Sequence, residues 1–357
     1  MKGEAASLGI TADIDEAVER LAEELRRRAL NLGASIDIDA RALLRTRANL
    51  LGFATPGLVS ANGHSRLLAS RDAWIAMSLA RPSDVDILEA LTGQPTDDDP
   101  WVSLSRSASD ADAVEFVARG RLLGLPMTVA ERRPPALNAP IELLKRAPAK
   151  PRTTLQGLRV ADLSSLWAGP LSARLLSDAG AEVIKIESST RLDGARARPE
   201  FYSTLHRADQ ESMIVDFSNA SEIDSLRQTL ESADVVIEGS RPRALEQLGL
   251  GPDQVTPRRG SVWLSVTGYG RRPPGEEWVA FGDDGAAAGG LLAWSVDGNP
   301  SFVGDAIADP LTGLFGALGV VESLLRGGGH LVDVSLQRSS SWVAANARDP
   351  FVDDRSP

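Results

Sequence analysis

The sequence predicts an α/β protein with a Rossmann-like, doubly wound parallel sheet domain and a smaller α+β domain. From residue 157 onward, short apolar runs alternate with amphipathic stretches, which is typical of parallel strands joined by helices. Five prolines between residues 133 and 154 predict a linker before this rhythm begins. The length of 357 residues also corresponds to about two domains.

The domain boundaries follow from these changes in composition. The expected parts are a smaller domain at 1–132, a proline-rich linker at 133–156, a Rossmann-like domain at 157–345 and a C-terminal tail at 346–357.

The smaller domain is expected to begin with a helix. Apolar residues at helical spacing, with Glu and Arg between them, predict this helix over residues 13–32. A loop rich in Gly, Ser, Pro and Asn follows at 52–65. The further predicted elements are a strand at 73–79, helices at 84–91 and 112–122, and an extended segment at 124–130.

The Rossmann-like domain is predicted from its alternating elements. Strands are predicted at 158–163, 181–187, 233–238 and 261–266, and helices at 169–179, 221–232 and 243–248. Ligands of such sheets bind at the carboxyl ends of the strands. Polar residues follow these strands at 162–167, 187–189, 238–241 and 267–270, so a ligand site is expected at that edge.

The composition argues against several classes of function. Acidic residues outnumber basic ones by 49 to 38, and the net charge of −11 disfavours a nucleic-acid partner, which would require Lys and Arg against phosphates. The absence of cysteine excludes disulfides, thiolate metal sites and a cysteine nucleophile. Because the chain has only three histidines, we expect no bound metal.

The N-terminus and the hydropathy predict a cytoplasmic protein without a membrane partner. Residues 1–6 lack the basic stretch and apolar core of a secretory signal. The longest nearly apolar stretch, at 285–296, is shorter than the roughly 20 residues that span a bilayer.

Two loops at the expected ligand edge carry candidate binding groups. Backbone N–H groups in the segment 162–170 favour an anion such as phosphate, and the alternative is an ordinary loop with Pro170 in the first helical turn. Arg241 could bind phosphate or carboxylate, or could be solvated. The chain has no Gly-x-Gly-x-x-Gly after this strand and no Gly-Lys-Ser/Thr loop, so a standard NAD site or P-loop is unsupported.

Two aspartates, Asp305 and Asp309, precede an apolar helix at 314–325. The helix dipole favours a carboxylate at such a position, where it could have a chemical role. The alternative is that Asp309 or Thr312 caps the helix and that Pro310 opens it.

Other polar residues have weaker signals. Asp283 and Asp284 could hold a divalent cation, but no third acidic ligand lies nearby in the sequence, so a cap or turn role is favoured. His64 lies in a loop of the kind that often touches substrate. Structural or solvated roles are expected for His206 and His330.

Taken in order, these motifs resemble the class III CoA-transferases, a family that includes formyl-CoA and carnitine CoA-transferases and α-methylacyl-CoA racemase. The resemblance is carried by VADLSSLWAGP at 160–170, RLLSDAGAEVIKIE at 174–187, ADVVIEGSRP at 233–242, SVTGYG at 265–270, GDAIADPLTG at 304–313 and GHLVDVSL at 329–336. The resemblance covers about half of the chain and implies the class III CoA-transferase fold.

The N-terminal part is similar to segments that lie downstream in ordinary family members. These segments are GLVSANGHSRLL at 57–68, RDAWIAMSL at 71–79 and RGRLLGLPMTVA at 119–130. We therefore expect a circularly permuted order of the two halves, which is tolerable where the original termini lie close together.

The resemblance implies roles for particular residues. Asp309 falls on the catalytic aspartate, which precedes a glycine by four positions. The CoA contacts fall on Ser165, Leu166, Trp167, Ala168 and Arg241. The glycine loop at the acyl group falls on Asn62, Gly63 and His64. Cations found in the family are replaced by Ser188 and Gln210, and the glycine loop has a single glycine.

The implied function is transfer of CoA from an acyl-CoA to a carboxylic acid through an anhydride and a thioester of Asp309. CoA is then substrate and product, no cofactor is tightly bound, and the partners are an acyl-CoA, an acceptor acid and a second copy in a homodimer. The alternatives are an acyl-CoA racemase or epimerase and a non-catalytic CoA-binding protein. Phe281 stands where the racemases have a proton-transferring histidine and speaks against the racemase.

Overall fold

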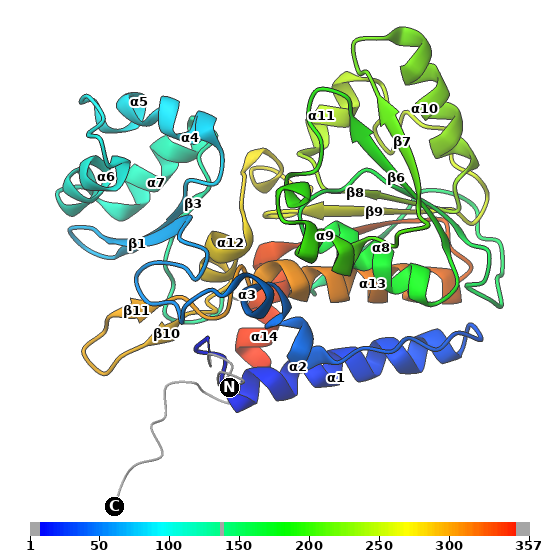
Figure 1. Ribbon diagram of the computed structural model, residues 1–357, viewed down its shortest axis with the longest axis horizontal. Coiled ribbons are helices and arrows are strands. Elements are labelled where there is room, and N and C mark those ends of the chain that lie inside the picture. The colour runs from blue at the N-terminus through cyan, green and yellow to red at the C-terminus, as the bar shows by residue number, and fades with distance from the viewer. Residues whose placement is uncertain (1–7, 136–138, 348–357) are drawn as a thin grey trace, which may run out of the picture.

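The computed structural model describes residues 8–135 and 139–347 (Figure 1). Residues 1–6, on which the expectation about a signal rests, and positions 348–357 of the expected tail lie outside these ranges. The larger part of the molecule is a seven-stranded sheet in the order β4-β12-β9-β8-β5-β6-β7. The strands are β4 (Ile141–Lys145), β12 (His330–Ser335), β9 (Val262–Thr267), β8 (Val235–Glu238), β5 (Arg159–Asp162), β6 (Glu182–Ser188) and β7 (Glu211–Val215).

All neighbouring strands in this sheet run parallel except β4, which pairs antiparallel with β12. Strands β8 and β9 are buried along their whole length because both faces of the sheet are covered, as their continuous apolar sequences predict. The covering helices are α8 (Ala168–Asp178), α9 (Pro199–Leu205), α10 (Ala220–Ser232), α11 (Pro242–Gln247), α13 (Ala308–Leu325) and α14 (Leu336–Asn346). The predicted α/β class and parallel sheet are confirmed.

Helix α13 is the central helix of the core. Its 18 residues are apolar and long enough to cross a membrane by length and composition, yet 78% of this stretch is buried inside the protein. It packs closely on α8, because a Cβ added at Gly313 would lie 2.8 Å from the carbonyl oxygen of Ala168. Ser172 Oγ also donates a hydrogen bond of 2.8 Å to the Gly313 carbonyl. Packing against protein therefore accounts for the apolar sequence of α13.

The smaller domain holds an antiparallel sheet in the order β1-β2-β3. Its elements are β1 (Ser65–Ala69), β2 (Trp74–Ser78), α4 (Pro82–Asp86), α5 (Leu88–Thr92), α6 (Pro100–Ser109), α7 (Ala113–Leu122) and β3 (Met127–Val129). Ile75, Met77 and Phe116 belong to its own hydrophobic core. A second cluster joins Ala76 of the sheet to Ala287 of α12 (Gly282–Ala288), a helix from the second half of the chain.

The architecture differs from the expected division in three ways. Helix α1 (Ala12–Leu30), with α2 (Ala40–Leu43) and α3 (Thr46–Leu51), does not join the smaller domain, because its apolar face packs in one core with α13 (Figure 1). The expected linker at 133–156 contains the edge strand β4. The helix expected at 84–91 is two short helices, α4 and α5, and the first of them begins at Pro82.

Candidate active site

A cavity of about 630 Å³ opens at the carboxyl ends of the parallel strands, where the sequence predicts a ligand site. Its walls come from the loop after β5, the end of β6, the turn after β8 and the segment before α12. Residues that line it include Ser165, Leu166, Ala168, Ser188, Arg191, Gly239, Arg241, Phe281 and Asp309. The structure therefore brings the candidate loop, Arg241 and Asp309 to one cavity.

The loop after β5 is held in a tight conformation. Leu166 has a φ of 71°, in the left-handed region. Its N–H donates a hydrogen bond of 2.9 Å to Asp193 Oδ1, and the N–H of Ser164 donates one of 2.9 Å to Asp162 Oδ1. These two hydrogen bonds hold the loop in a conformation in which Ser165 lines the cavity.

Trp167 is the exception among the four loop residues expected to contact CoA. Its side chain is only 1% exposed and does not line the cavity. It packs edge-on against Phe201, with ring centroids 5.0 Å apart, and lies beneath the Arg47 guanidinium at 4.7 Å. The Trp167 side chain points into the core as α8 begins, and the expected CoA contact of this residue stays a prediction.

Asp309 lies in the first turn of α13 without capping it. The N-cap is Ile307, which makes no side-chain cap bond, and Thr312 Oγ1 donates instead to the Ala308 carbonyl at 2.7 Å. Within the described residues the Asp309 carboxylate accepts no hydrogen bond, and it faces the cavity. The alternative of a capping role for Asp309 or Thr312 is therefore wrong.

The surroundings of Asp309 raise its pKa to about 7. Burial is the largest cause, because it penalises the charged carboxylate. The positive charge of Arg47 opposes this shift, while the carboxylates of Asp283 and Asp305 add to it. A carboxylate with a pKa near neutrality and no hydrogen bond is suited to act as a nucleophile or proton acceptor.

The two neighbouring carboxylates are fully engaged. Asp305 is completely buried and pairs with Arg47 through contacts of 2.6 and 2.7 Å. Asn62 Nδ2 donates to Asp283 Oδ2 at 3.0 Å and to Asp305 Oδ1 at 3.2 Å. Asp283 also accepts a hydrogen bond of 2.8 Å from the Ala306 N–H. The carboxylates of Asp305 and Asp283 are therefore occupied by structural contacts. Among these three aspartates, only Asp309 has carboxylate oxygens without a hydrogen-bond partner among the described residues.

Asp284 has the capping role that the sequence favours. Its Oδ1 accepts hydrogen bonds from the Phe281 N–H at 2.9 Å and from Ser78 Oγ at 2.6 Å. Burial raises its pKa to about 7. No group of three potential metal ligands occurs in the part of the chain that the structure describes.

The expected glycine loop is only partly at the site. Asn62 reaches the carboxylates, whereas Gly63 and His64 are exposed and do not line the cavity. The Gly63 N–H donates to the Ser60 carbonyl at 2.9 Å, and the His64 N–H donates to Asn62 Oδ1 at 2.8 Å. Both amides therefore stabilise the turn, and neither is free for a ligand in this conformation.

Sequence reasoning missed Arg47, which α3 brings to the site. Arg47 lies in an ordinary amphipathic segment, and nothing in the local sequence marks it as a site residue. Its ion-pair partner Asp305 lies 258 residues further along the chain. The position of Gln210 was also unforeseen. It lines a separate hollow at the amino end of β7, whereas Ser188 lines the 630 Å³ cavity. A lysine at Gln210 would therefore lie at the opposite edge of the sheet from this cavity.

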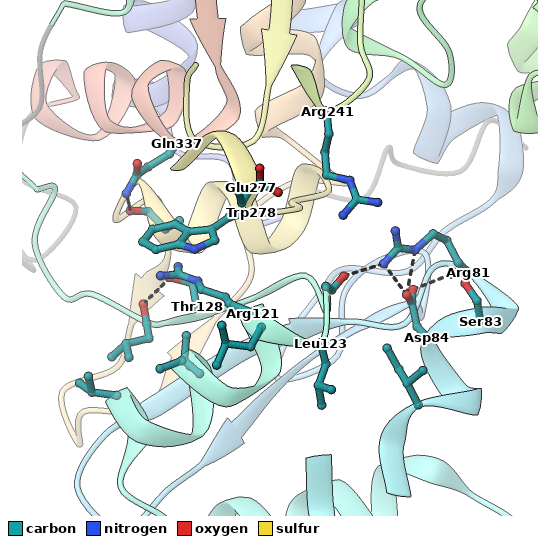
Figure 2. A pocket seen from close by; sticks show the side chains of 18 of the residues that line it. Arg81, Ser83, Asp84, Arg121, Leu123, Thr128, Arg241, Glu277, Trp278 and Gln337 are labelled. Atoms are coloured by element: carbon teal, nitrogen blue, oxygen red, sulfur yellow. Dashed lines mark hydrogen bonds and ion pairs between the residues drawn. The ribbon is translucent and has the colours of Figure 1, made fainter. Parts of the chain in front are cut away.

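A second cavity, of about 1000 Å³, lies between the two domains (Figure 2). Arg81, Arg241 and Trp278 line both cavities, so the two are neighbours. Arg121 of α7 lies over the Trp278 ring at 3.8 Å and donates to Tyr269 Oη at 3.3 Å. Through these contacts the smaller domain packs against Tyr269 and Trp278, in the segment that precedes α12.

Comparisons with known proteins agree with the observed fold. CoA-transferase family III matches residues 155–349. The chain is 31% identical to succinyl-CoA–D-citramalate CoA-transferase of Chloroflexus aurantiacus, over 52% of this chain and 50% of that protein. It is 30% identical to succinyl-CoA:glutarate CoA-transferase of Mus musculus, over 54% of this chain and 48% of that protein.

A crystal structure of a hypothetical protein from Mycobacterium tuberculosis is also similar, with 29% identity and a TM-score of 0.50. The match covers 56% of this chain and 57% of that chain. The chain spans about half the length of the curated relatives it matches. Since the family match covers more than half of the sequence and the sheet has the expected architecture, the chain belongs to CoA-transferase family III.

Proposed function

We propose that the protein transfers CoA from an acyl-CoA thioester to a carboxylic acid, with Asp309 as the nucleophile. The observation that carries this proposal is the partly buried Asp309 carboxylate, which accepts no hydrogen bond from a described residue and faces the cavity at the strand ends. The names of the relatives, which contain succinyl-CoA as donor, suggest a short dicarboxylic acyl-CoA as the first donor to test.

The proposed reaction uses four transfers at carbonyl carbons. Asp309 attacks the thioester carbonyl, and the tetrahedral intermediate expels CoA thiolate to leave a mixed anhydride. The thiolate then attacks the Asp309 carbonyl of this anhydride, which releases the donor acid as a carboxylate and leaves an Asp309–CoA thioester. The acceptor carboxylate attacks that thioester and expels the thiolate again. Attack of the thiolate on the acceptor carbonyl gives the new acyl-CoA and regenerates the Asp309 carboxylate.

Burial supports this chemistry in two respects. A raised pKa makes the Asp309 carboxylate more basic, and a nucleophile that accepts no hydrogen bond needs less desolvation before attack. An anhydride is readily hydrolysed, so a site that restricts water protects it. Phe281 lines the cavity and has no ionisable group, which disfavours racemisation by two proton-transferring residues.

The test is to incubate the protein with succinyl-CoA and a panel of carboxylic acids and to follow the new acyl-CoA by mass spectrometry. Peptide mapping should find a CoA or acyl adduct on Asp309. Asp309→Asn should lose transfer by a factor of about 10³ or more, while Asp297→Asn, in an exposed turn, should retain it. Full activity in Asp309→Asn, or CoA binding with no transfer to any acid, would overturn the proposal. Exchange of the acyl α-hydrogen with solvent deuterium, without an acceptor acid, would favour a racemase.

We further propose that the order of the two halves is circularly permuted. Arg20 Nη2 of α1 donates to the carbonyl of Asn346 at the end of α14, at 2.8 Å, so the first helix lies against the end of the last one. A superposition on the solved relative that ignores chain order tests this idea. It should place β1, β2 and β3 on a segment downstream of that protein's Rossmann half, and a failure to overlay would refute the permutation.

A homodimer and a cytoplasmic location also remain proposals, which the family resemblance and the sequence motivate. Analytical ultracentrifugation of the purified protein would test the dimer, and a monomer at micromolar concentration would contradict it. Fractionation of the source cells would test the location.

A further inference from the structure

Helix α7 of the smaller domain carries apolar side chains on two sides. Phe116 and Val117 lie on its inner side and pack in the core of that domain. Val114, Ala118 and Leu122 are spaced four residues apart, so they form one stripe along another side of the helix. Val114 is 65% exposed and Leu122 is 89% exposed. Helix α7 therefore has an apolar stripe that the core of its domain does not cover.

The α7 stripe forms one wall of the 1000 Å³ cavity between the domains (Figure 2). All three of its residues line this cavity, and so do the apolar side chains of Ile87 and Val129. Trp278 of the Rossmann-like half lines it too. Single exposed apolar residues are common on protein surfaces, whereas a continuous apolar wall in a cavity of this size is typical of a ligand site.

Most charged groups that line this cavity already have partners. Arg81 Nε donates to Asp84 Oδ1 at 2.8 Å, and Arg243 pairs with Glu277 at 3.2 Å. Arg121 lies over the Trp278 ring at 3.8 Å and donates to the Met127 carbonyl at 3.1 Å. The cavity therefore offers a ligand more apolar surface than free charge.

A short series of contacts joins this cavity to the proposed nucleophile. Gly282 lies against Asp309, because a Cβ added at Gly282 would be 2.4 Å from Asp309 Oδ2. Phe281 precedes this glycine and lines the 630 Å³ cavity. The Arg81 guanidinium carbon is 5.8 Å from the centre of the Phe281 ring, and Arg81 lines both cavities. An acyl chain that extends from Asp309 past Phe281 would therefore reach the α7 stripe.

We propose that the interdomain cavity binds the apolar chain of the acceptor acid, and that this acceptor is a medium-chain aliphatic monocarboxylic acid. The inference rests on the proposed function for the reaction at Asp309. The side chains of the α7 stripe cannot pair with a second carboxylate, but they can remove an alkyl chain from water. The stripe is about 12 Å long at the rise of an α-helix, which corresponds to an extended chain of about eight to ten carbons.

Binding of an unreactive thioether tests the proposal without turnover. In calorimetric titrations, S-octyl-CoA should bind the wild type at least about tenfold more tightly than CoA. The double variant Val114→Thr/Leu122→Gln should lose most of this gain and bind CoA as the wild type does. The matched control, Val102→Thr/Leu30→Gln, changes exposed apolar residues that line neither cavity and should keep the gain.

The rate of transfer gives a second measurement. With succinyl-CoA as donor, kcat/KM for straight-chain acids from butanoate to decanoate should rise by about threefold for each added methylene. Ala118→Phe places a ring in the cavity and should lower kcat/KM for decanoate at least about tenfold, with butanoate almost unaffected. Equal values of kcat/KM along the series would contradict the proposed acceptor.

The outcomes separate this inference from the proposed function. If the wild type transfers CoA but binds S-octyl-CoA no more tightly than CoA, the inference is overturned and the transferase proposal stands. If the α7 stripe proves necessary for tight binding of S-octyl-CoA but no acid accepts CoA, the cavity binds an alkyl chain and the transferase proposal fails. If the stripe variants keep the wild-type affinity and instead turn a dimer into a monomer, the stripe is a subunit interface and the inference is overturned.

Discussion

The guanidinium of Arg47 and the carboxylate of Asp305 meet through two hydrogen bonds, Nη2 to Oδ1 at 2.6 Å and Nε to Oδ2 at 2.7 Å. The same guanidinium lies over the Trp167 ring and provides the positive charge that most opposes the rise in the pKa of Asp309. Arg47 of α3 therefore contacts the loop after β5 and also influences the charge state of the proposed nucleophile.

Replacing Arg47 should change the pH dependence of transfer as well as stability. In Arg47→Gln the pKa of Asp309 should rise further, so the activity should appear only at higher pH. Removing one partner of this buried pair should also lower the free energy of unfolding by about 3 kcal/mol. Arg47→Lys retains the charge without the paired geometry and should shift the pH profile less. A pH–rate profile identical to that of the wild type would contradict this role.

The wild-type enzyme should lose activity as the pH falls through about 7. Asp309 has a pKa of about 7, so its carboxylate is mostly protonated below that value, and a protonated carboxyl group cannot attack a thioester. Measurement of kcat/KM from pH 5.5 to 8.5 should show a rise toward alkaline pH. A flat profile over this range would mean that the ionisation of Asp309 does not limit the reaction.

Asp284 should make the protein less stable as the pH rises from about 4 to 7. Its pKa of about 7 in the folded protein exceeds the ordinary value of 3.8, so within this range the folded state holds a proton that the unfolded state has released. Asp284→Asn should remove this dependence and be more stable than the wild type at pH 8, by about 2–4 kcal/mol. Urea unfolding at pH 5 and pH 8, with Asp297→Asn as the control, measures the difference. An equal stability difference at both pH values would argue against a buried titrating carboxyl group.

Gly282→Ala should damage the site directly. A Cβ at this position would lie 2.4 Å from Asp309 Oδ2 and 2.4 Å from the Ala306 carbonyl oxygen, which is closer than side-chain contacts allow. Displacement of the carboxylate should reduce kcat/KM by about tenfold or more. Gly57→Ala, where an added Cβ meets nothing within 4 Å, is the matched control. Unchanged activity in both variants would show that the Asp309 oxygen can move without loss.

The part of the fold that local sequence determines was predictable. Strands such as β8 and β9 are mostly apolar because they are buried on both faces, and the helix α7 begins at Ala113, directly after its cap Asp112. Strand β4 was missed because it is a partly exposed edge strand with Glu142 and Lys145 in a proline-rich region. Edge strands lack the apolar pattern that reveals central ones.

The site was predictable to a similar degree. The position of Asp309 ahead of an apolar helix, together with the resemblance, led to the nucleophile candidate, whose chemical role still awaits its test. Arg47 could not be found in this way, because an ion pair across 258 residues leaves no local pattern. The sequence also did not reveal which side of the loop the Trp167 ring would take, because its neighbours Arg47 and Phe201 are distant in the sequence.

The contact between α1 and α13 also matters for how the protein is made. Protein synthesis produces the amphipathic helix α1 and Arg47 long before α13 and Asp305 exist. Until then, the apolar face of α1 has no partner on which to pack, and closing so long a loop slows folding. Helix α1 therefore reaches its final position only after the second half of the chain has been made, and during that interval its apolar stripe is exposed.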